Sequence, residues 1–245
     1  NNSVLVTGTN SITGTNSLWT NSGALIVGAY RSGNTLVISN RGTVANTEGY
    51  IGFYGISSNT SSNNSVLVTG THSLWTNSNT LYVGLGGSGN SMVISNGGTV
   101  ANTEGSIGRV SNTSSNNSVL VTGTNSLWSN SGYIHVGYEG SGNSLVISDS
   151  GRVASGLGSI GFSAASSNNS VLVTGADSLW TNRGIYFYVG SGGSSNSLII
   201  SNGGTVANRL AGGTIGNTST ASNNSVLVTG SNSLWTNSGN LTVGN

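Results

Sequence analysis

The chain has 245 residues, of which only 4% are charged, and its formal net charge is +1. Its six basic residues are all Arg and lie singly along the chain, which excludes the basic stripe of a nucleic-acid-binding protein. No run of 18 apolar residues occurs, so no helix is expected to span a membrane, and the absence of Cys excludes stabilising disulfides. Gly, Ser, Thr and Asn dominate the remainder, yet 34% of residues are hydrophobic and recur at fixed positions, which favours a folded chain over a disordered one.

Two phrases with matching polar and apolar positions alternate along the whole chain. The first reads NNSVLVTGTNSLWTNSG, clearest at 223–239 with Ser231 in place of Thr, and the second reads NSLVISNGGTVAN. Self-similarity at a fixed period indicates stacked repeats that bury a shared core. Aligning the phrases divides the chain into nine units, 1–33, 34–62, 63–89, 90–115, 116–142, 143–167, 168–195, 196–222 and 223–245. The sequence opens and closes inside a repeat, which predicts a slice of a longer array.

Each unit contains three short apolar stretches separated by Gly, Asn, Ser and Thr, as residues 66–68, 74–75 and 81–83 illustrate. β-Branched residues dominate these stretches, and their length is too short for helices, so they are typical of strands bounded by turns. We therefore predict an all-β fold, a right-handed parallel β-solenoid of about nine coils of roughly 26 residues. With three strands per coil and a strand spacing of about 4.8 Å, the rod would be on the order of 43 Å long.

One Asn recurs at the same place in every unit, just before the first apolar stretch. Stacked amides at strand spacing can hydrogen-bond to the coils above and below, so this column is predicted to form a structural ladder at a corner. An Asn-lined binding face or glycosylation is the alternative. The column comprises Asn2, Asn34, Asn64, Asn90, Asn117, Asn143, Asn169, Asn196 and Asn224.

The first apolar stretch of each unit has three residues, whose side chains alternate between the two faces of a strand. If the outer two point to the core, the middle column forms an apolar stripe on the surface, and such a stripe usually marks an interface. A local bend that tucks all three residues inside is the alternative. The column comprises Leu5, Val37, Leu67, Val93, Leu120, Val146, Leu172, Ile199 and Leu227.

A Trp occurs in every second unit, at Trp19, Trp75, Trp128, Trp180 and Trp235. Alignment of the two phrases places Ala45, Ala101, Ala154 and Ala207 in the same column, with Leu74 and Val100 in the neighbouring one. The Trp residues would then be two coils apart, about 9.6 Å, which is too far for direct ring stacking. Two orientations remain open: an exposed Trp ladder that could stack on sugar rings, or Trp rings packed against the rod or inside a wide core.

Catalytic and metal-binding patterns are not apparent in the sequence. The five acids are scattered; Glu48 and Glu104 share a column but lie two coils apart, near the long end of the spacing of glycosidase carboxylate pairs. His72 and His135 fall in different columns with no third ligand, and no Ca²⁺-binding nonapeptide is present. We expect no cofactor, no metal and no enzymatic activity.

The pattern G-x-x-S-x-W-T-N-x-G-x-L-x-V-G followed by G-S-G-x-S-L-V-I-S-N-G-G-T-V covers essentially the whole chain. Residues 123–137 and 140–153 carry it, with Ser129, Asp149 and Arg152 as departures. This combination resembles the type V secretion and PEP-CTERM-associated repeat family. The resemblance implies a bacterial extracellular or surface passenger folded as a β-solenoid, as in long autotransporter-like proteins. It implies no catalytic residues, because the family has none.

Two functions are consistent with these features. The first is a non-enzymatic extracellular structural rod or fibre that associates with its own copies, laterally or end to end. The second is a surface adhesin that binds glycan, or another cell surface, through outward columns such as the Trp residues. The orientation of the Trp side chains distinguishes the two, because only an exposed ring can stack on a sugar.

Overall fold

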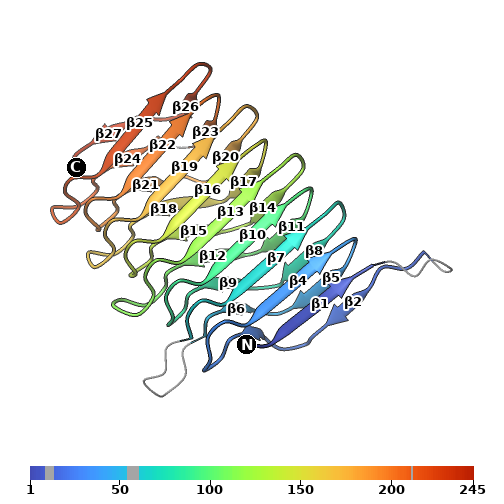
Figure 1. The fold of residues 1–245 in the computed structure, drawn as a ribbon. Coiled ribbons are helices and arrows are strands. Elements are labelled where there is room, and N and C mark those ends of the chain that lie inside the picture. Colours follow the sequence, from blue (N-terminus) through green and yellow to red (C-terminus); the bar gives the residue numbers. More distant parts are fainter. Residues whose placement is uncertain (9–13, 54–60, 211) are drawn as a thin grey trace.

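The structure is a computed structural model that describes residues 1–8, 14–53, 61–210 and 212–245. Within these residues every regular element is a strand, and no helix is present that could cross a membrane. The chain winds as a parallel β-solenoid with the predicted three strands per coil, and the coils turn in the right-handed sense (Figure 1). The first and last strands lie at opposite ends of the stack (Figure 1).

Three sheets of parallel strands form the walls of the solenoid, and each coil contributes one strand to each sheet. Sheet 1 consists of β1 (Ser3–Thr7), β4 (Thr35–Ser39), β7 (Ser65–Thr69), β10 (Ser91–Ser95), β13 (Ser118–Thr122), β16 (Ser144–Ser148), β19 (Ser170–Thr174), β22 (Ser197–Ser201) and β25 (Ser225–Thr229). Sheet 2 consists of β2 (Leu18–Thr20), β5 (Thr43–Asn46), β8 (Leu74–Asn77), β11 (Thr99–Asn102), β14 (Leu127–Asn130), β17 (Arg152–Ser155), β20 (Leu179–Asn182), β23 (Thr205–Asn208) and β26 (Leu234–Asn237). Sheet 3 consists of β3 (Leu25–Val27), β6 (Gly49–Ile51), β9 (Thr80–Val83), β12 (Glu104–Ile107), β15 (Tyr133–Val136), β18 (Leu157–Ile160), β21 (Phe187–Val189), β24 (Thr214–Ile215) and β27 (Thr242–Val243).

The core is one continuous apolar column enclosed by the three sheets. In sheet 1 the outer two residues of each apolar triplet point inward, as Leu145 and Ile147 of β16 do, and both are fully buried. Each such aliphatic side chain contributes about 1.5–3 kcal/mol on burial. Because every coil repeats the same inward positions, the core extends through the stack without interruption.

The Asn that recurs just before the first strand of each coil forms the predicted ladder, at the corner that leads into sheet 1. The Oδ1 atom of each Asn accepts from both the backbone N–H and the side-chain amide of the Asn one coil earlier. For Asn90 and Asn117 the two distances are 2.9 and 3.0 Å. The ladder therefore gives a partner to a backbone N–H that would otherwise be buried without one where the strands diverge at the corner.

A Gly in the left-handed region makes room for each step of the ladder. Gly84 has φ +80°, and a Cβ built there would lie 2.3 Å from the Nδ2 atom of Asn117. A side chain at this position would therefore combine backbone strain with a clash against a buried amide. The repeated Val-Gly and Ile-Gly pairs of the sequence thus belong to the same corner as the Asn ladder.

Candidate functional site

The Trp residues point into the core, so of the two orientations left open by the sequence the exposed glycan platform is excluded. Trp75, Trp128 and Trp180 are fully buried, and Trp19 and Trp235, in the outermost coils, are partly buried and pack against the same core. The predicted alignment of Trp with Ala is wrong by one residue. Val44 pairs with Trp75 and Val100 pairs with Trp128, whereas Ala45 pairs with Thr76. A shift of one residue reverses the face on which every side chain of a strand lies.

Room for each indole comes from sheet 3 and not from the neighbouring strand. A Cβ built on Gly105 would lie 2.5 Å from the Cζ2 atom of Trp128, so only Gly fits at this inward position of β12. The neighbouring coils carry Leu81 and Ile134 there. Trp128 and Ile134 thus belong to one coil, and the preceding coil carries Val100 and Gly105 at these places. The indole fills the space over Gly105, so the core stays filled.

The polar atom of each central indole is satisfied by the corner between sheets 2 and 3. The Nε1 atom of Trp128 donates to the Oδ1 atom of Asn102 at 2.9 Å, and that of Trp75 donates to Asn46 at 2.8 Å. Trp180 uses the hydroxyl of Ser155 at 3.0 Å. In both phrases the second strand ends in Asn or Ser, and Trp or Val stands two residues before that end. Aligning the two phrases on this last residue would have placed Trp beside Val, as the structure does.

The middle column of sheet 1 faces outward and forms what we term the apolar ridge. Its nine residues pair directly from coil to coil. In the inner coils these residues are half-buried by their neighbours, except Ile199, which is exposed as Leu5 and Leu227 are. The ridge comprises Leu5, Val37, Leu67, Val93, Leu120, Val146, Leu172, Ile199 and Leu227. The alternative of a bend that hides this column is excluded.

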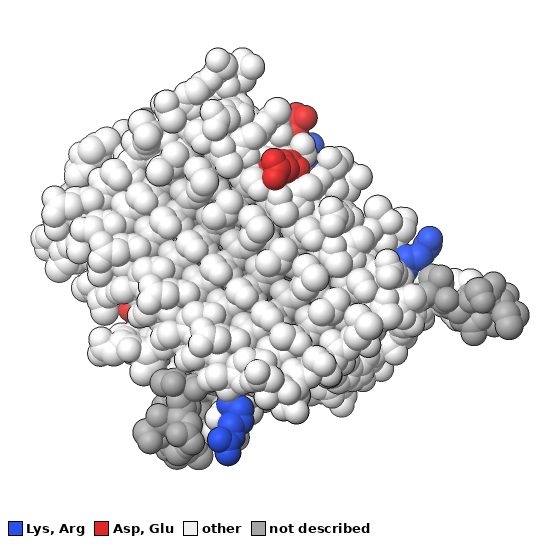
Figure 2. Space-filling model, in the orientation of Figure 1, with Lys and Arg blue, Asp and Glu red and all other residues white. Residues whose placement is uncertain are grey.

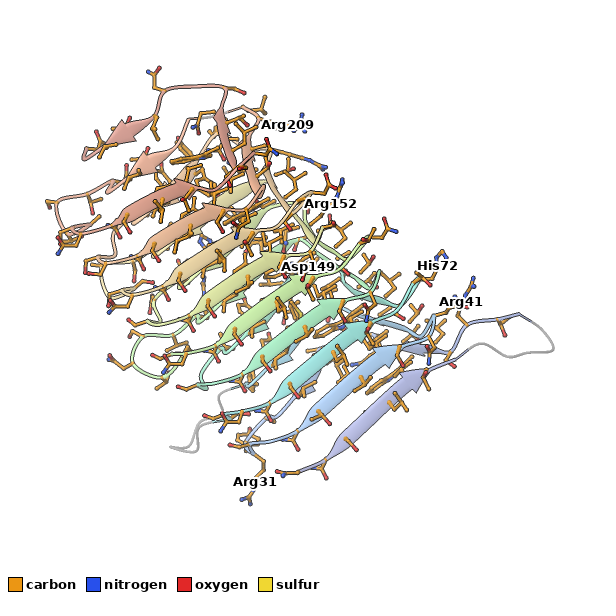
Figure 3. The ribbon with its side chains drawn as sticks, turned by 45° about the horizontal axis from the view of Figure 1, so that its top comes forward. Arg31, Arg41, His72, Asp149, Arg152 and Arg209 are labelled. Atoms are coloured by element: carbon orange, nitrogen blue, oxygen red, sulfur yellow. The ribbon has the colours of Figure 1, made fainter. Side chains whose placement is uncertain are left out.

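Columns of Ser and Thr flank the apolar ridge on both sides, and in the column on the side toward sheet 2 the hydroxyls bond in pairs. The Ser95 hydroxyl donates to Thr69 at 2.9 Å, and the Ser148 hydroxyl donates to Thr122 at the same distance. None of the outward side chains of sheet 1 is charged along its described strands. Figure 2 shows this face almost free of charge, with the charged residues at its margins. Arg41, His72 and Asp149 lie along the edge toward sheet 2, and Arg31 lies along the opposite edge (Figure 3).

The outer face of sheet 3 carries a hollow of about 490 Å³, which we term the aromatic slot. Its floor is Gly158 and Ser159 of β18, and its walls are aromatic residues of the coils on either side. The lining comprises Glu104, Arg109, Tyr133, His135, Tyr138, Leu157, Gly158, Ser159, Phe162, Tyr186, Tyr188 and Ser191. A second hollow of about 530 Å³ lies at β1–β3 where Trp19 and Leu25 face it, and it is the open end of the core in this structure.

His135 lies in the wall of the aromatic slot and is only 7% exposed. Its ring stacks on Tyr133 with centroids 5.4 Å apart, and Tyr138 and Phe162 approach it edge-on at 5.0 and 4.9 Å. Burial, reinforced by the nearby charge of Arg109, lowers the pKa of His135 to about 4, so the ring is neutral at physiological pH. Its Nδ1 atom is buried and has no hydrogen-bond partner.

Sequence reasoning missed the aromatic slot, although a signal was present. Tyr133 and His135 are two residues apart in a strand, as are Tyr186 and Tyr188, so each pair lies on one face of its strand. The residue within each pair, Ile134 or Phe187, is apolar and buried, so the aromatic residues on either side of it point outward. The intervening coil carries Ser159 at the equivalent place, and only the stacking of the coils joins the two pairs into one hollow.

The remaining titratable residues do not gather into a catalytic or metal-binding group in the described part of the chain. Glu104 registers with Thr80, and Glu48 directly precedes β6, whose Gly49 registers with Leu81, so the two acids lie two coils apart, as predicted. His72 lies in the turn after β7 of sheet 1, whereas His135 lies in β15 of sheet 3, so the two residues belong to different columns. No group of three His, Asp or Glu side chains that could hold a metal ion occurs among the residues described.

Comparison with known proteins finds no match to this chain among protein-family models, curated proteins or solved structures. The resemblance to the type V secretion and PEP-CTERM-associated repeat family therefore stays a prediction.

Proposed function

We propose that this chain is a non-catalytic structural rod that associates side by side with a second copy through the apolar ridge. The ridge is the single feature that carries the proposal, because contiguous apolar patches of this length usually mark an interface. It runs along all nine strands of sheet 1, which at strand spacing corresponds to roughly 38 Å. Its width is one residue per strand, between the two hydroxyl columns.

The surroundings of the apolar ridge favour another copy of the chain as its partner. Identical faces meet without repulsion only where they lack net charge, and the outward side chains of the described sheet 1 strands are all Ser, Thr, Val, Leu or Ile. On the side of the ridge toward sheet 2 the flanking hydroxyls, such as those of Ser95 and Thr69, already bond in pairs. Burial of that column therefore leaves few of its polar groups without a partner, which keeps its cost of desolvation low.

A position outside the cell, at a bacterial surface, is part of the same proposal. The family resemblance of the repeats supports it. A long uncharged repeat suits a role that depends on length and lateral packing. Binding of glycan by the Trp column is no longer an alternative, since those rings form the core.

The test is a pair of matched double variants. Leu67 and Leu172 lie on the apolar ridge, whereas Leu74 and Leu179 are equally half-buried and face outward on sheet 2 of the same two coils. Light scattering and electron microscopy should show lateral assemblies for the unmodified chain and for Leu74→Lys/Leu179→Lys. Leu67→Lys/Leu172→Lys should be dispersed. Equal assembly of both double variants, or a monomeric unmodified chain at high concentration, would overturn the proposal.

A further inference from the structure

We propose that the aromatic slot on sheet 3 is a binding site for a neutral oligosaccharide. This function is separate from the side-by-side association through sheet 1, because the two faces belong to different walls of the solenoid. The slot is a built feature of four adjacent coils, since small residues in one coil lie between large aromatic residues in the coils before and after it.

The strand register explains how the hollow forms. His135 of β15, Ser159 of β18 and Tyr188 of β21 occupy one outward column, in which the central residue is the small one. Tyr133 registers with Leu157, and Tyr186 directly precedes β21, whose Phe187 registers with Gly158. Two aromatic walls therefore stand on either side of β18, and the slot runs along that strand.

Buried polar atoms without partners line the same column. The Nδ1 atom of His135 and the hydroxyl oxygens of Ser106 and Ser159 form no hydrogen bond within the protein. His135 is 7% exposed, and Ser159, in the floor of the slot, is 3% exposed. An unsatisfied buried polar group is unfavourable and calls for an explanation, and a bound ligand with hydroxyl groups would supply partners to those that line the slot.

The chemistry of the walls favours a sugar. Tyr133 and Tyr186 are 42% and 50% exposed and belong to coils two apart, a spacing of roughly 9.6 Å along the stack that suits the length of a disaccharide. Tyrosine offers an apolar ring face for the C–H face of a sugar and a hydroxyl for its polar edge. Pockets that combine aromatic walls with a few placed polar groups are typical of small-ligand sites.

The charges at the rim argue against a cationic ligand. The guanidinium carbon of Arg109 lies 3.6 Å from the ring centroid of Tyr138, so the protein's own cation already occupies that aromatic face. Glu104 lies on the same rim and can accept from sugar hydroxyls. With one Arg and one Glu lining it and a neutral His135, the slot has no net charge to attract an ion.

The test uses saturation-transfer NMR and calorimetry with cello-, chito-, xylo-, malto- and mannotriose, together with tetramethylammonium. We expect at least one trisaccharide to bind, and Tyr133→Ala or Tyr186→Ala to weaken its binding about tenfold. Ser159→Leu should abolish binding by filling the floor from the outward face. Tyr30→Ala, which removes a tyrosine that is 51% exposed outside the slot, is the control and should bind as the unmodified chain does.

Three results would overturn the proposal: no binding of any trisaccharide at millimolar concentration, binding of tetramethylammonium instead, or equal losses of affinity for Tyr30→Ala and Tyr186→Ala. The wall tyrosines are half-exposed and lie outside the core, so circular dichroism should show that their variants fold. The sugar titrations are run on the dispersed Leu67→Lys/Leu172→Lys variant as well as on the unmodified chain. Failure of sugar binding is thereby separated from failure of side-by-side association.

Discussion

Gly105 of β12 lies directly against the indole of Trp128, which enters the core from sheet 2 one coil later. A Cβ at Gly105 would be 2.5 Å from Cζ2 and 3.1 Å from Cη2 of that ring. The indole is fully buried and its Nε1 atom is held by Asn102, so the ring cannot move away without breaking a buried hydrogen bond. This contact explains why one coil carries a large aromatic residue and the other carries none.

Gly105→Ala should therefore destabilise the chain by about 1–3 kcal/mol through overpacking. The free energy of unfolding in urea measures the effect. Gly23→Ala is the control, because a Cβ at Gly23 meets no atom within 4 Å, and it should be near neutral. In a Trp128→Phe background the cost of Gly105→Ala should shrink, and an unchanged cost would show that the indole is not the obstacle.

Asn117 stands in the middle of the Asn ladder and should be sensitive to truncation. Asn117→Ala removes the acceptor of the Asn90 backbone N–H and side-chain amide, which lie at 2.9 and 3.0 Å, and leaves both donors buried. We expect a loss of about 3 kcal/mol, since each unsatisfied buried donor costs about 1–3 kcal/mol. Thermal or urea unfolding provides the measurement. Asn240→Ala, at an exposed Asn, should change the midpoint little, and similar losses for both variants would contradict the ladder's role.

His135 should make the stability depend on pH. Its pKa is lowered from 6.5 to about 4 in the folded chain, first by burial and then by Arg109. Above pH 6.5 the ring is neutral in both states. Between pH 6.5 and 4 the unfolded chain binds a proton on this residue and the folded chain does not. As the pH is lowered through this range, the free energy of unfolding therefore decreases by roughly 3 kcal/mol in total.

Urea midpoints at pH 7.5 and pH 4.5 for the unmodified chain and for His135→Phe measure this effect. The variant keeps an aromatic ring beside Tyr133 and Tyr138 and should lose much of the pH dependence. Glu104 and Arg109 also line the slot, and both chains retain them, so the difference between the two chains isolates the imidazole. An identical pH dependence in both chains would show that His135 is accessible to protons when folded.

Fluorescence should report the inward orientation of the Trp residues. In Trp19→Phe/Trp235→Phe only the three fully buried indoles remain. Their emission should be blue-shifted and only weakly quenched by acrylamide, while the unmodified chain contains an additional accessible fraction from Trp19 and Trp235. Quenching of the double variant at the rate of a free indole would contradict the fold of the core.

Much of the architecture could be predicted from the sequence because each coil packs mainly on its two neighbours, whose amino-acid sequences are closely similar to its own. Equivalent residues must then stack, so the three strands per coil and the Asn column follow from period and alternation alone. The structure was needed to exclude a bend that would hide the middle residue of sheet 1. The Asn ladder is an example. Asn64 and Asn90 occupy equivalent positions in successive units, so their stacking could be predicted, and the structure added the hydrogen bond between their side chains.

Tertiary structure decided the two features that matter for binding. The face on which Trp75 lies depends on a one-residue register against Val44, and its space depends on Gly49, which belongs to a different sheet. Likewise the aromatic slot joins Tyr133 and Tyr186, which are two coils apart in the chain and meet around Ser159 only when the coils stack. Repetition determines which residues form columns, whereas packing across the solenoid determines which columns are core and where a hollow opens.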